Sequence, residues 1–204
     1  MHRTYRTEAI ILAGRDVGEA NRFVHLFTPD LGLIGAMAQG ARRVSARTRL
    51  HLATFSLARV SLVRGRQMWR VTNAIAEMNF GTTFGQHADA FAVVSRIVSV
   101  LRRLVVGEEG NEALFFSVKE SFDALVKASM ADEPGATPLL STTHMIEYIE
   151  VARILHVLGY LDRAPAIAPF VDSGGFSAGL IADARTQTRS LARAINAALR
   201  ESQL

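Results

Sequence analysis

The sequence Leu31-Gly-Leu-Ile-Gly-Ala-Met-Ala-Gln-Gly40 is followed directly by Ala-Arg-Arg-Val-Ser-Ala-Arg-Thr-Arg49. The first part is small and apolar, which favours a buried strand that ends at Gly40. The second part holds four arginines within eight residues, at Arg42, Arg43, Arg47 and Arg49. Because guanidinium groups bind phosphate oxygens through paired hydrogen bonds, a strand that leads into this loop predicts a nucleic-acid contact.

The segment on either side of this stretch, residues 8–78, carries strand signals. Apolar or alternating runs separated by turn residues predict five short strands, at residues 9–13, 22–27, 33–38, 55–63 and 68–76. The sequences Thr28-Pro-Asp-Leu-Gly32 and Arg64-Gly-Arg-Gln67 have the composition of turns. Five short strands in a basic segment with aromatic residues favour the oligonucleotide-binding fold, or OB-fold, and an SH3-like barrel is the alternative.

The pattern becomes helical after about residue 82. Apolar residues recur at helical spacing and predict four amphipathic helices, at residues 91–105, 114–126, 145–158 and 181–200. Residues 160–182 hold prolines and glycines without any period and are interpreted as an irregular connector. The sequence therefore predicts an α+β protein, with a five-stranded OB-fold β-barrel over residues 1–80 and an all-helical domain over residues 81–204.

The charge of the chain is unevenly distributed. Residues 1–80 hold twelve arginines and five acidic residues, for a net charge of +7, whereas residues 81–204 have a net charge of −3. A basic first part is typical of a domain that binds a polyanion. The chain has no cysteine, which excludes disulfides, thiolate metal sites and cysteine nucleophiles. No apolar run reaches the roughly 18 residues of a membrane span, and the amino terminus lacks the pattern of a secretory signal.

A second group of candidate DNA-binding residues surrounds the last predicted turn. Arg64, Arg66 and Arg70 flank Trp69 in the sequence. The indole of Trp69 could stack on a base while the flanking arginines hold the adjoining phosphates. The alternative is that Trp69 belongs to the barrel core, because tryptophans are often buried.

Other aromatic and basic residues of the predicted barrel are weaker candidates. Phe23 and Phe27 are interpreted as core residues, because they alternate with their neighbours along a predicted strand. Arg15 and Arg22 are minor candidates for phosphate contacts.

Arginines of the helical part could bind an acidic peptide tail of a partner protein. Arg96, Arg102 and Arg103 occupy the polar face of the first long helix, and Arg153 lies on the third. The alternative is an ordinary solvated face. A further basic stripe, either an extension of the DNA track or another solvated face, lies on the last predicted helix at Arg185, Arg189 and Arg193.

No arrangement of residues indicates catalysis. His144, Glu147 and Glu150 share one helical face, but their spacing is not that of a metalloprotease motif, and no second pair completes a metal site. The sequence has no phosphate-binding glycine loop with a lysine and no nucleophile elbow. We therefore expect a protein without catalytic residues, cofactor or bound metal.

Several short motifs occur in one order over about 65 residues. They are Thr7-Glu-Ala-Ile-Ile-Leu12, Asp16-Val-Gly-Glu-Ala-Asn-Arg22, Leu26-Phe-Thr-Pro-Asp-Leu-Gly-Leu33, Gly40-Ala-Arg-Arg43 and Arg64-Gly-Arg-Gln-Met-Trp-Arg70. This ordered set resembles the amino-terminal domain of the RecO family of bacterial DNA repair and recombination mediator proteins. The helical part resembles the family more loosely, at Leu158-Gly-Tyr160 and Gly174-Gly-Phe176.

The resemblance implies an OB-fold and a helical domain without enzymatic chemistry. It implies binding of single- and double-stranded DNA, annealing of complementary strands, contact with the acidic carboxy-terminal tail of single-stranded DNA-binding protein, and recombinase loading with RecR. It also implies a bacterial, cytoplasmic, nucleoid-associated protein. Many members bind zinc through four cysteines in the connector, whereas residues 160–183 hold none here, so no zinc is expected. A protein-interaction adaptor with a basic barrel and an RNA-binding barrel are the alternatives.

Overall fold

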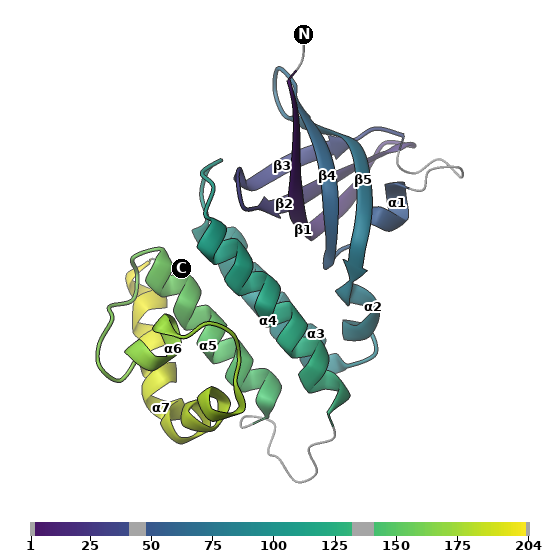
Figure 1. The fold of residues 1–204 in the computed structure, drawn as a ribbon. Helices are drawn as coiled ribbons and strands as arrows, with labels where there is room; N and C mark the ends of the chain where they lie inside the picture. The colour runs from purple at the N-terminus through teal and green to yellow at the C-terminus, as the bar shows by residue number, and fades with distance from the viewer. Residues whose placement is uncertain (1–2, 41–47, 132–140, 203–204) are drawn as a thin grey trace. The chain divides into compact units, whose positions relative to one another are not determined.

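The computed structural model describes residues 3–40, 48–131 and 141–202 (Figure 1). The chain divides into two compact units. The first unit contains Met1–Thr83 and Val106–Phe115, and the second contains Phe84–Val105 and Phe116–Leu204. The segment Val106–Phe115 therefore belongs with the strands, although it follows the first long helix in the chain.

Five strands of the first unit close into a barrel (Figure 1). They are β1 (Thr4–Val17), β2 (Asn21–Thr28), β3 (Gly32–Ala38), β4 (Ser56–Arg64) and β5 (Trp69–Asn79). The short helix α1 (Thr48–His51) joins β3 to β4 and packs beside β5. The strand order around the barrel is β1-β2-β3-β5-β4, with β3 parallel to β5 and the other pairs antiparallel. The predicted α+β class with an OB-fold barrel is confirmed.

The first strand is longer than the sequence predicted. β1 spans 14 residues rather than residues 9–13, because its polar ends also find strand partners. Its first half pairs with β4, starting with Thr4 opposite Val63. Its second half pairs with β2, with an irregularity between Ile11 and Ala13. One long strand therefore closes the barrel by contacting two neighbours in turn.

The barrel core is filled by apolar side chains that point inward. On β2 these are Val24 and Leu26, both fully buried, so the alternate residues Phe23 and Phe27 point out of the barrel. Phe27 is nevertheless buried, because its ring packs against that of Phe115 with centroids 5.8 Å apart. The expectation that both phenylalanines are core residues is therefore confirmed for Phe27 and wrong for Phe23, which stays half-buried at the surface.

The segment Val106–Phe115 lies against the turn between β2 and β3. A Cβ atom on Gly110 would lie 2.5 Å from the carbonyl oxygen of Asp30, and one on Gly32 would meet the backbone of Glu109. Gly32 also has a positive φ of 62°, which other residues rarely adopt. Glycine at both positions therefore allows the close approach of two backbones, which covers the Phe27 end of the outer face of β2.

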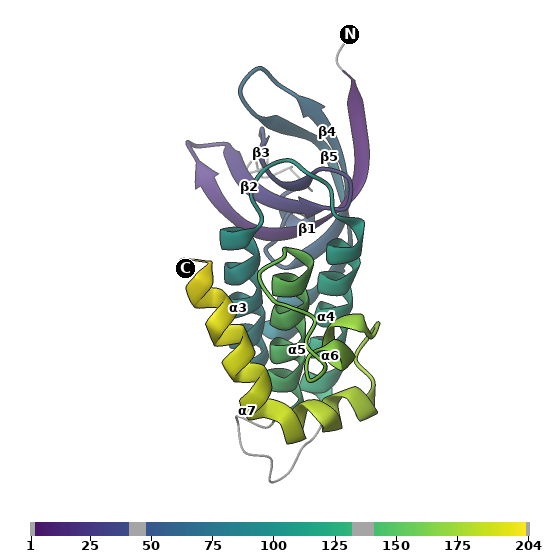
Figure 2. The same cartoon turned by 90° about the vertical axis from the view of Figure 1, so that its left-hand side faces the viewer.

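The second unit is built from helices (Figure 2). After α2 (Phe80–Phe84), the long helices are α3 (Ala88–Leu104), α4 (Glu112–Met130), α5 (Thr142–Val157) and α7 (Ala178–Glu201), and the first residues of α4 belong to the first unit. Helix α5 packs against both α3 and α7. Because neighbours cover it on several sides, α5 has buried residues all round its circumference, and these include Glu150 and Arg153.

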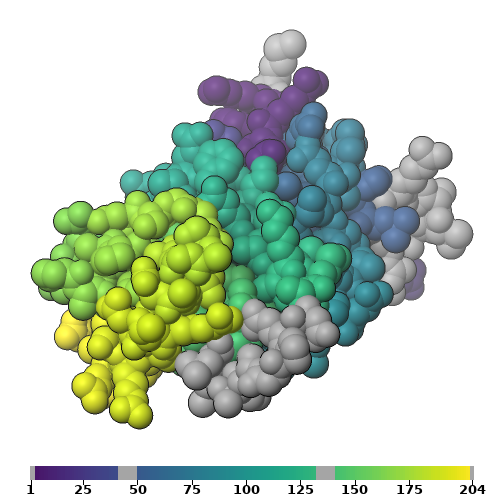
Figure 3. All heavy atoms as spheres, turned by 60° about the horizontal axis from the view of Figure 1, so that its bottom comes forward, coloured from purple at the N-terminus to yellow at the C-terminus, as the bar shows by residue number. Residues whose placement is uncertain are grey.

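The connector between α5 and α7 contains a short helix that the sequence did not predict. This helix, α6 (Ala168–Asp172), has a proline in its first turn and buries Phe170. Ser177 then caps α7, because its side chain accepts a hydrogen bond from the backbone N–H of Leu180. Figure 3 shows α7, in yellow, at the molecular surface.

Candidate nucleic-acid interface

Four outward-pointing residues form a row across the barrel, one from each of four neighbouring strands. Arg15 of β1 is paired with Phe23 of β2. Phe23 is paired in turn with Met37 of β3, and Met37 with Arg70 of β5. Because neighbouring strands lie about 4.8 Å apart, this transverse row spans roughly 14 Å. The row has a cation at each end and two apolar side chains in the middle.

Phe23 lies half-exposed inside the transverse row. Its ring packs over Gly35 of β3, where a Cβ atom would come within 2.6 Å of the ring. His25 meets the ring edge-on with centroids 5.2 Å apart, and the guanidinium of Arg15 lies 5.4 Å from the ring centroid. Arg15 is exposed, so it can exchange the ring for a phosphate at a cost of about 0.5–1 kcal/mol. This face of β2 and β3 is where OB-folds bind oligonucleotides.

The β4–β5 hairpin adds arginines at the Arg70 end of the row. Arg66 lies in the turn and, like Arg70, is exposed. A depression of about 420 Å³ at this turn is lined by Gly65, Arg66, Gln67, Met68 and Arg70. Arg64 is exposed as well, but it forms an ion pair with Glu108, and its guanidinium lies 4.9 Å from the ring centroid of Trp69. Arg66 and Arg70 therefore present their charge to solvent, whereas Arg64 shares its charge with a carboxylate.

Trp69 points into the barrel and is only 4% exposed. Its ring meets that of Tyr5 edge-on with centroids 5.1 Å apart. The prediction that Trp69 stacks on a base is therefore wrong. Strand alternation explains the error, because it places Trp69 and Val71 inside the barrel and leaves Arg70, between them, outside.

The arginine-rich stretch after β3 lies largely outside the described residues. Arg42, Arg43 and Arg47 belong to residues 41–47, and the side chain of Arg49 is not described either. The stretch follows β3, the strand that carries Met37. The DNA-binding role of these four arginines stays a prediction.

Two of the helical arginines are exposed and a third is engaged in an ion pair. Arg96 on α3 donates from Nε and Nη2 to the two carboxylate oxygens of Glu147 on α5, at 2.5 and 2.6 Å. These hydrogen bonds raise the pKa of Arg96. Such exposed pairs contribute about 0–1 kcal/mol, so an acidic tail could compete for this arginine. Arg102 and Arg103 are exposed in the last turn of α3. Tail binding by these three residues stays a prediction.

Arg153 holds the connector and is only 4% exposed. Its guanidinium donates to the backbone carbonyl oxygens of Phe170 at 3.0 Å, Ser173 at 2.6 Å and Gly175 at 2.7 Å. It also lies 4.6 Å from the ring centroid of Phe176. The prediction that Arg153 binds a partner tail is therefore wrong, because this side of α5 is covered by the connector and not by solvent.

Glu150 lies one turn before Arg153 and is completely buried. Burial raises the pKa of its carboxyl to about 8, although the hydrogen bond from Ser117 and the charge of Arg153 act in the opposite direction. The Ser117 hydroxyl donates at 2.8 Å. The carboxyl is therefore largely protonated at neutral pH. Arg153 Nη1 lies 3.9 Å from Glu150 Oε2, so this contact is one between a cation and a neutral acid.

The raised pKa of Glu150 predicts that the helical unit loses stability as the pH rises. The folded carboxyl binds its proton more tightly than the unfolded one, whose pKa is near 4.5. This contribution is fully present below about pH 4.5 and is lost as the pH rises through about 8. Urea unfolding across this range should show that Glu150→Gln becomes progressively more stable relative to wild type. A difference between the two proteins that does not change with pH would contradict the assignment.

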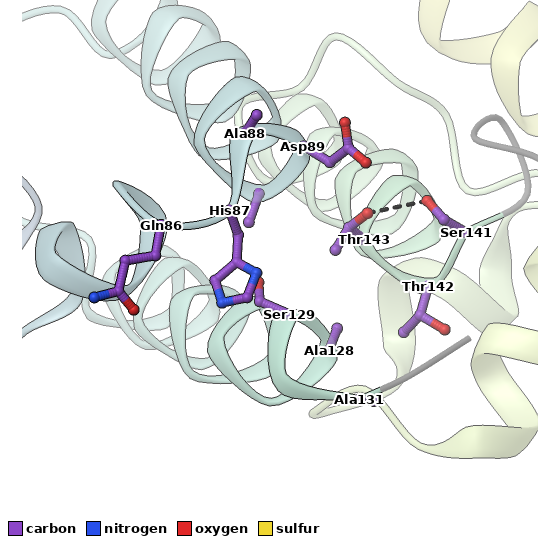
Figure 4. Close-up of a pocket in the computed structure, with 11 residues that line it drawn as sticks. Gln86, His87, Ala88, Asp89, Ala128, Ser129, Ala131, Ser141, Thr142 and Thr143 are labelled. Carbon is purple, nitrogen blue, oxygen red and sulfur yellow. Dashed lines mark hydrogen bonds between the residues drawn. The ribbon is translucent and has the colours of Figure 1, made fainter. Parts of the chain in front are cut away.

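A cavity of about 470 Å³ in the second unit lies at the start of α3, the end of α4 and the start of α5 (Figure 4). Its described walls are small or polar, and Ser141 and Thr143 are joined there by a hydrogen bond of 3.0 Å. These walls include the carboxylate of Asp89 and no arginine or lysine. The cavity therefore lacks the charge that would attract a phosphate.

The described residues offer neither a metal site nor a membrane span. No group of three or more His, Asp or Glu side chains that could hold a metal ion occurs within residues 3–40, 48–131 and 141–202. In those ranges, no helix combines the length and the apolar character needed to cross a membrane.

The sequence alone did not identify the transverse row. The alternation of residues along β2 was visible in the sequence. In the structure, however, Val24 and Leu26 face the barrel core and the phenylalanines do not. The sequence indicated Met37 only as part of an apolar predicted strand. The pairing of Arg15 with Phe23 depends on the hairpin register, which residue spacing does not fix.

The first unit has the architecture of a nucleic-acid-binding domain, because it is an OB-fold barrel whose outer face carries exposed arginines beside a half-exposed aromatic ring. Residues 1–79 match the model of the family described as "Recombination protein O N terminal". This barrel domain is therefore similar to the amino-terminal domain of the RecO family.

The relatives carry the name DNA repair protein RecO. The protein from Dehalococcoides mccartyi is 38% identical to this chain over 128 residues, which cover 63% of this chain and 50% of the relative. The protein from Nocardioides sp. is 33% identical over 104 residues, which cover 51% of this chain and 43% of the relative. The protein from Caldanaerobacter subterraneus is 24% identical over 159 residues, which cover 78% of this chain and 60% of the relative. The chain thus spans about half the length of the curated relatives it matches.

Proposed function

We propose that this protein is a non-enzymatic DNA-binding mediator of recombinational repair. It binds single-stranded DNA, anneals complementary strands and helps to load the recombinase onto strands coated with single-stranded DNA-binding protein. The observation that carries the proposal is the transverse row, in which the half-exposed Phe23 lies on the binding face of an OB-fold with exposed Arg15 and Arg70 at the two ends. Similarity to the RecO family supports the role in DNA repair.

Annealing by such a surface needs no catalytic residue. Two DNA strands repel each other through their phosphates, and arginines that neutralise the phosphates lower this repulsion. Stacking on Phe23 would hold a base by its flat face and leave its pairing edge accessible to the complementary strand. Because every base has such a face, binding should depend little on sequence.

The helical unit would serve the protein partners. Arg102 and Arg103, with Arg96 once it is released from Glu147, would attract the acidic tail of single-stranded DNA-binding protein. The other partners in this proposal are double-stranded DNA and RecR. The protein would act in the bacterial cytoplasm in association with the nucleoid.

The proposal is tested by titrating the protein with labelled single-stranded DNA, single-stranded RNA of the same sequence and an acidic carboxy-terminal peptide, each at two salt concentrations. We expect binding to DNA whose affinity falls with salt, with a logarithmic slope of about −0.7 for each phosphate neutralised. A clear preference for RNA would favour the RNA-binding alternative. Binding to the peptide without binding to DNA would favour the protein-interaction adaptor.

The same titration tests the arginine-rich stretch separately from the row. The double variant Arg42→Ala/Arg43→Ala should weaken binding to all DNA sequences about equally, because phosphate contacts carry no sequence information. If its affinity at low salt equalled that of wild type, these two residues would not belong to the interface.

A further inference from the structure

We propose that the barrel has a second DNA-binding surface, on the outer face of β1, β4 and β5, which holds the second strand during annealing. This inference rests on the proposed annealing function. Two rows of paired residues define the surface, which we call the β4 surface. Arg6 of β1, Ser61 of β4 and Asn73 of β5 form one row. Arg59 of β4 and Ile75 of β5 belong to the next.

The β4 surface contains a shallow depression with the donors that phosphates need. Its volume is about 230 Å³, and it is lined by Arg6, Arg59, Val60, Ser61, Asn73 and Ile75. The two arginines come from adjacent strands and are diagonal neighbours in the sheet, a spacing that long side chains can bridge. Two guanidiniums, an amide and a hydroxyl therefore converge on one hollow, as donors for phosphate oxygens.

The charges on this surface allow an incoming phosphate to compete. Arg59 pairs with Glu77, but 71% of the Arg59 side chain is exposed. Exposed ion pairs are weak, so a phosphate can replace the carboxylate of Glu77. Arg6 is exposed and makes no ion pair with any residue that the structure describes. Glu8 is the other carboxylate of this face, where it is paired in register with Arg59.

A nucleic-acid strand fits the β4 surface better than an acidic peptide for two reasons. Ile75 is 56% exposed beside the donors and offers an apolar contact for a sugar or base. Asn73 also lies only three residues along β5 from Arg70, about 10 Å, so the β4 surface begins where the transverse row ends. Two strands held on these two surfaces would lie on the same barrel.

The test measures binding of two strands in sequence. Wild-type protein is saturated with a donor-labelled oligothymidine, and an acceptor-labelled oligothymidine, which cannot pair with it, is then titrated in. Energy transfer reports the second strand, and the annealing rate of complementary oligonucleotides is measured separately. For Arg6→Ala/Arg59→Ala we expect first-strand affinity to change by less than about threefold. Second-strand affinity and annealing rate should both fall by about tenfold.

Two further variants distinguish the expected loss of second-strand binding from misfolding and from a general effect of charge. Glu77→Gln removes the competing carboxylate and should strengthen second-strand binding, a gain that misfolding cannot produce. Arg163→Ala/Arg200→Ala removes the same charge from exposed positions of the helical unit and should leave both strands unaffected. Thermal unfolding of each variant checks the fold.

Other outcomes would overturn the inference. Equal losses of first- and second-strand affinity would make the β4 surface part of the first site. Unchanged second-strand binding in Arg6→Ala/Arg59→Ala would remove the surface from DNA binding altogether. Loss of binding to an acidic peptide, with annealing intact, would assign the surface to a protein partner. Failure of the wild-type protein to bind even the first strand would instead overturn the proposed function.

Discussion

Replacing Arg153 with methionine should lower the free energy of unfolding of the helical unit by about 2–4 kcal/mol. Methionine keeps much of the length of the side chain and none of its donors. The variant would therefore leave the backbone carbonyl oxygens of Phe170, Ser173 and Gly175 without the guanidinium that they accept from. A buried acceptor that loses its partner costs about 1–3 kcal/mol, which applies in full to the Phe170 oxygen, and the part-buried oxygens of Ser173 and Gly175 add smaller losses.

The measurement is urea unfolding followed by far-ultraviolet circular dichroism, which reports the helices. Arg163→Met is the matched control, because Arg163 also belongs to the connector and donates to both carboxylate oxygens of Asp172, but on the exposed surface. Water can replace that pair, so the control should unfold almost as wild type does. Similar losses in both variants would mean that Arg153 stabilises the connector no more than a surface ion pair.

The barrel was predictable from sequence because its strands mostly bury one face. An alternating or apolar run of residues indicates a strand with a buried face, and the runs in β2, β3, β4 and β5 were long enough to be found. The ends of β1 were missed because their burial is weak. Thr4 and Arg6 are exposed at one end, and Arg15 and Asp16 at the other, yet all of them pair with a neighbouring strand.

The candidate site was harder to predict, because residue type does not say which way a side chain points. Trp69 and Arg70 are neighbours in the sequence, and both were assigned to DNA, but only Arg70 faces solvent. Arg153 was predicted to bind a partner tail, with a solvated helix face as the alternative, and both interpretations left it at the surface, where arginines usually lie. Its burial depends on an irregular connector that folds back over α5, and no periodic pattern encodes such a path.

Replacing Phe23 with alanine should weaken binding of single-stranded DNA by about 1–3 kcal/mol, the value of one base stacked on an aromatic ring. This corresponds to a loss of affinity of roughly 5- to 150-fold. Phe116→Ala is the matched control. Phe116 is also a surface phenylalanine, 43% exposed, with a cation nearby, the ammonium of Lys119 at 5.9 Å from its ring centroid, but it lies on α4. DNA affinity in the control should stay at the wild-type value.

Loss of the arginines of the transverse row should change the salt dependence of DNA binding, whereas loss of Phe23 should not, because the arginines act through charge. Arg15→Ala/Arg70→Ala removes two phosphate contacts, so the slope of the logarithm of affinity against the logarithm of salt should become shallower by about 1.4. Phe23→Ala should lower affinity at every salt concentration and leave that slope unchanged, since stacking releases no counterions. If Phe23→Ala bound DNA as tightly as wild type while the arginine variant lost affinity, the barrel would hold DNA by its backbone alone. The half-exposed ring would then have no part in the interface.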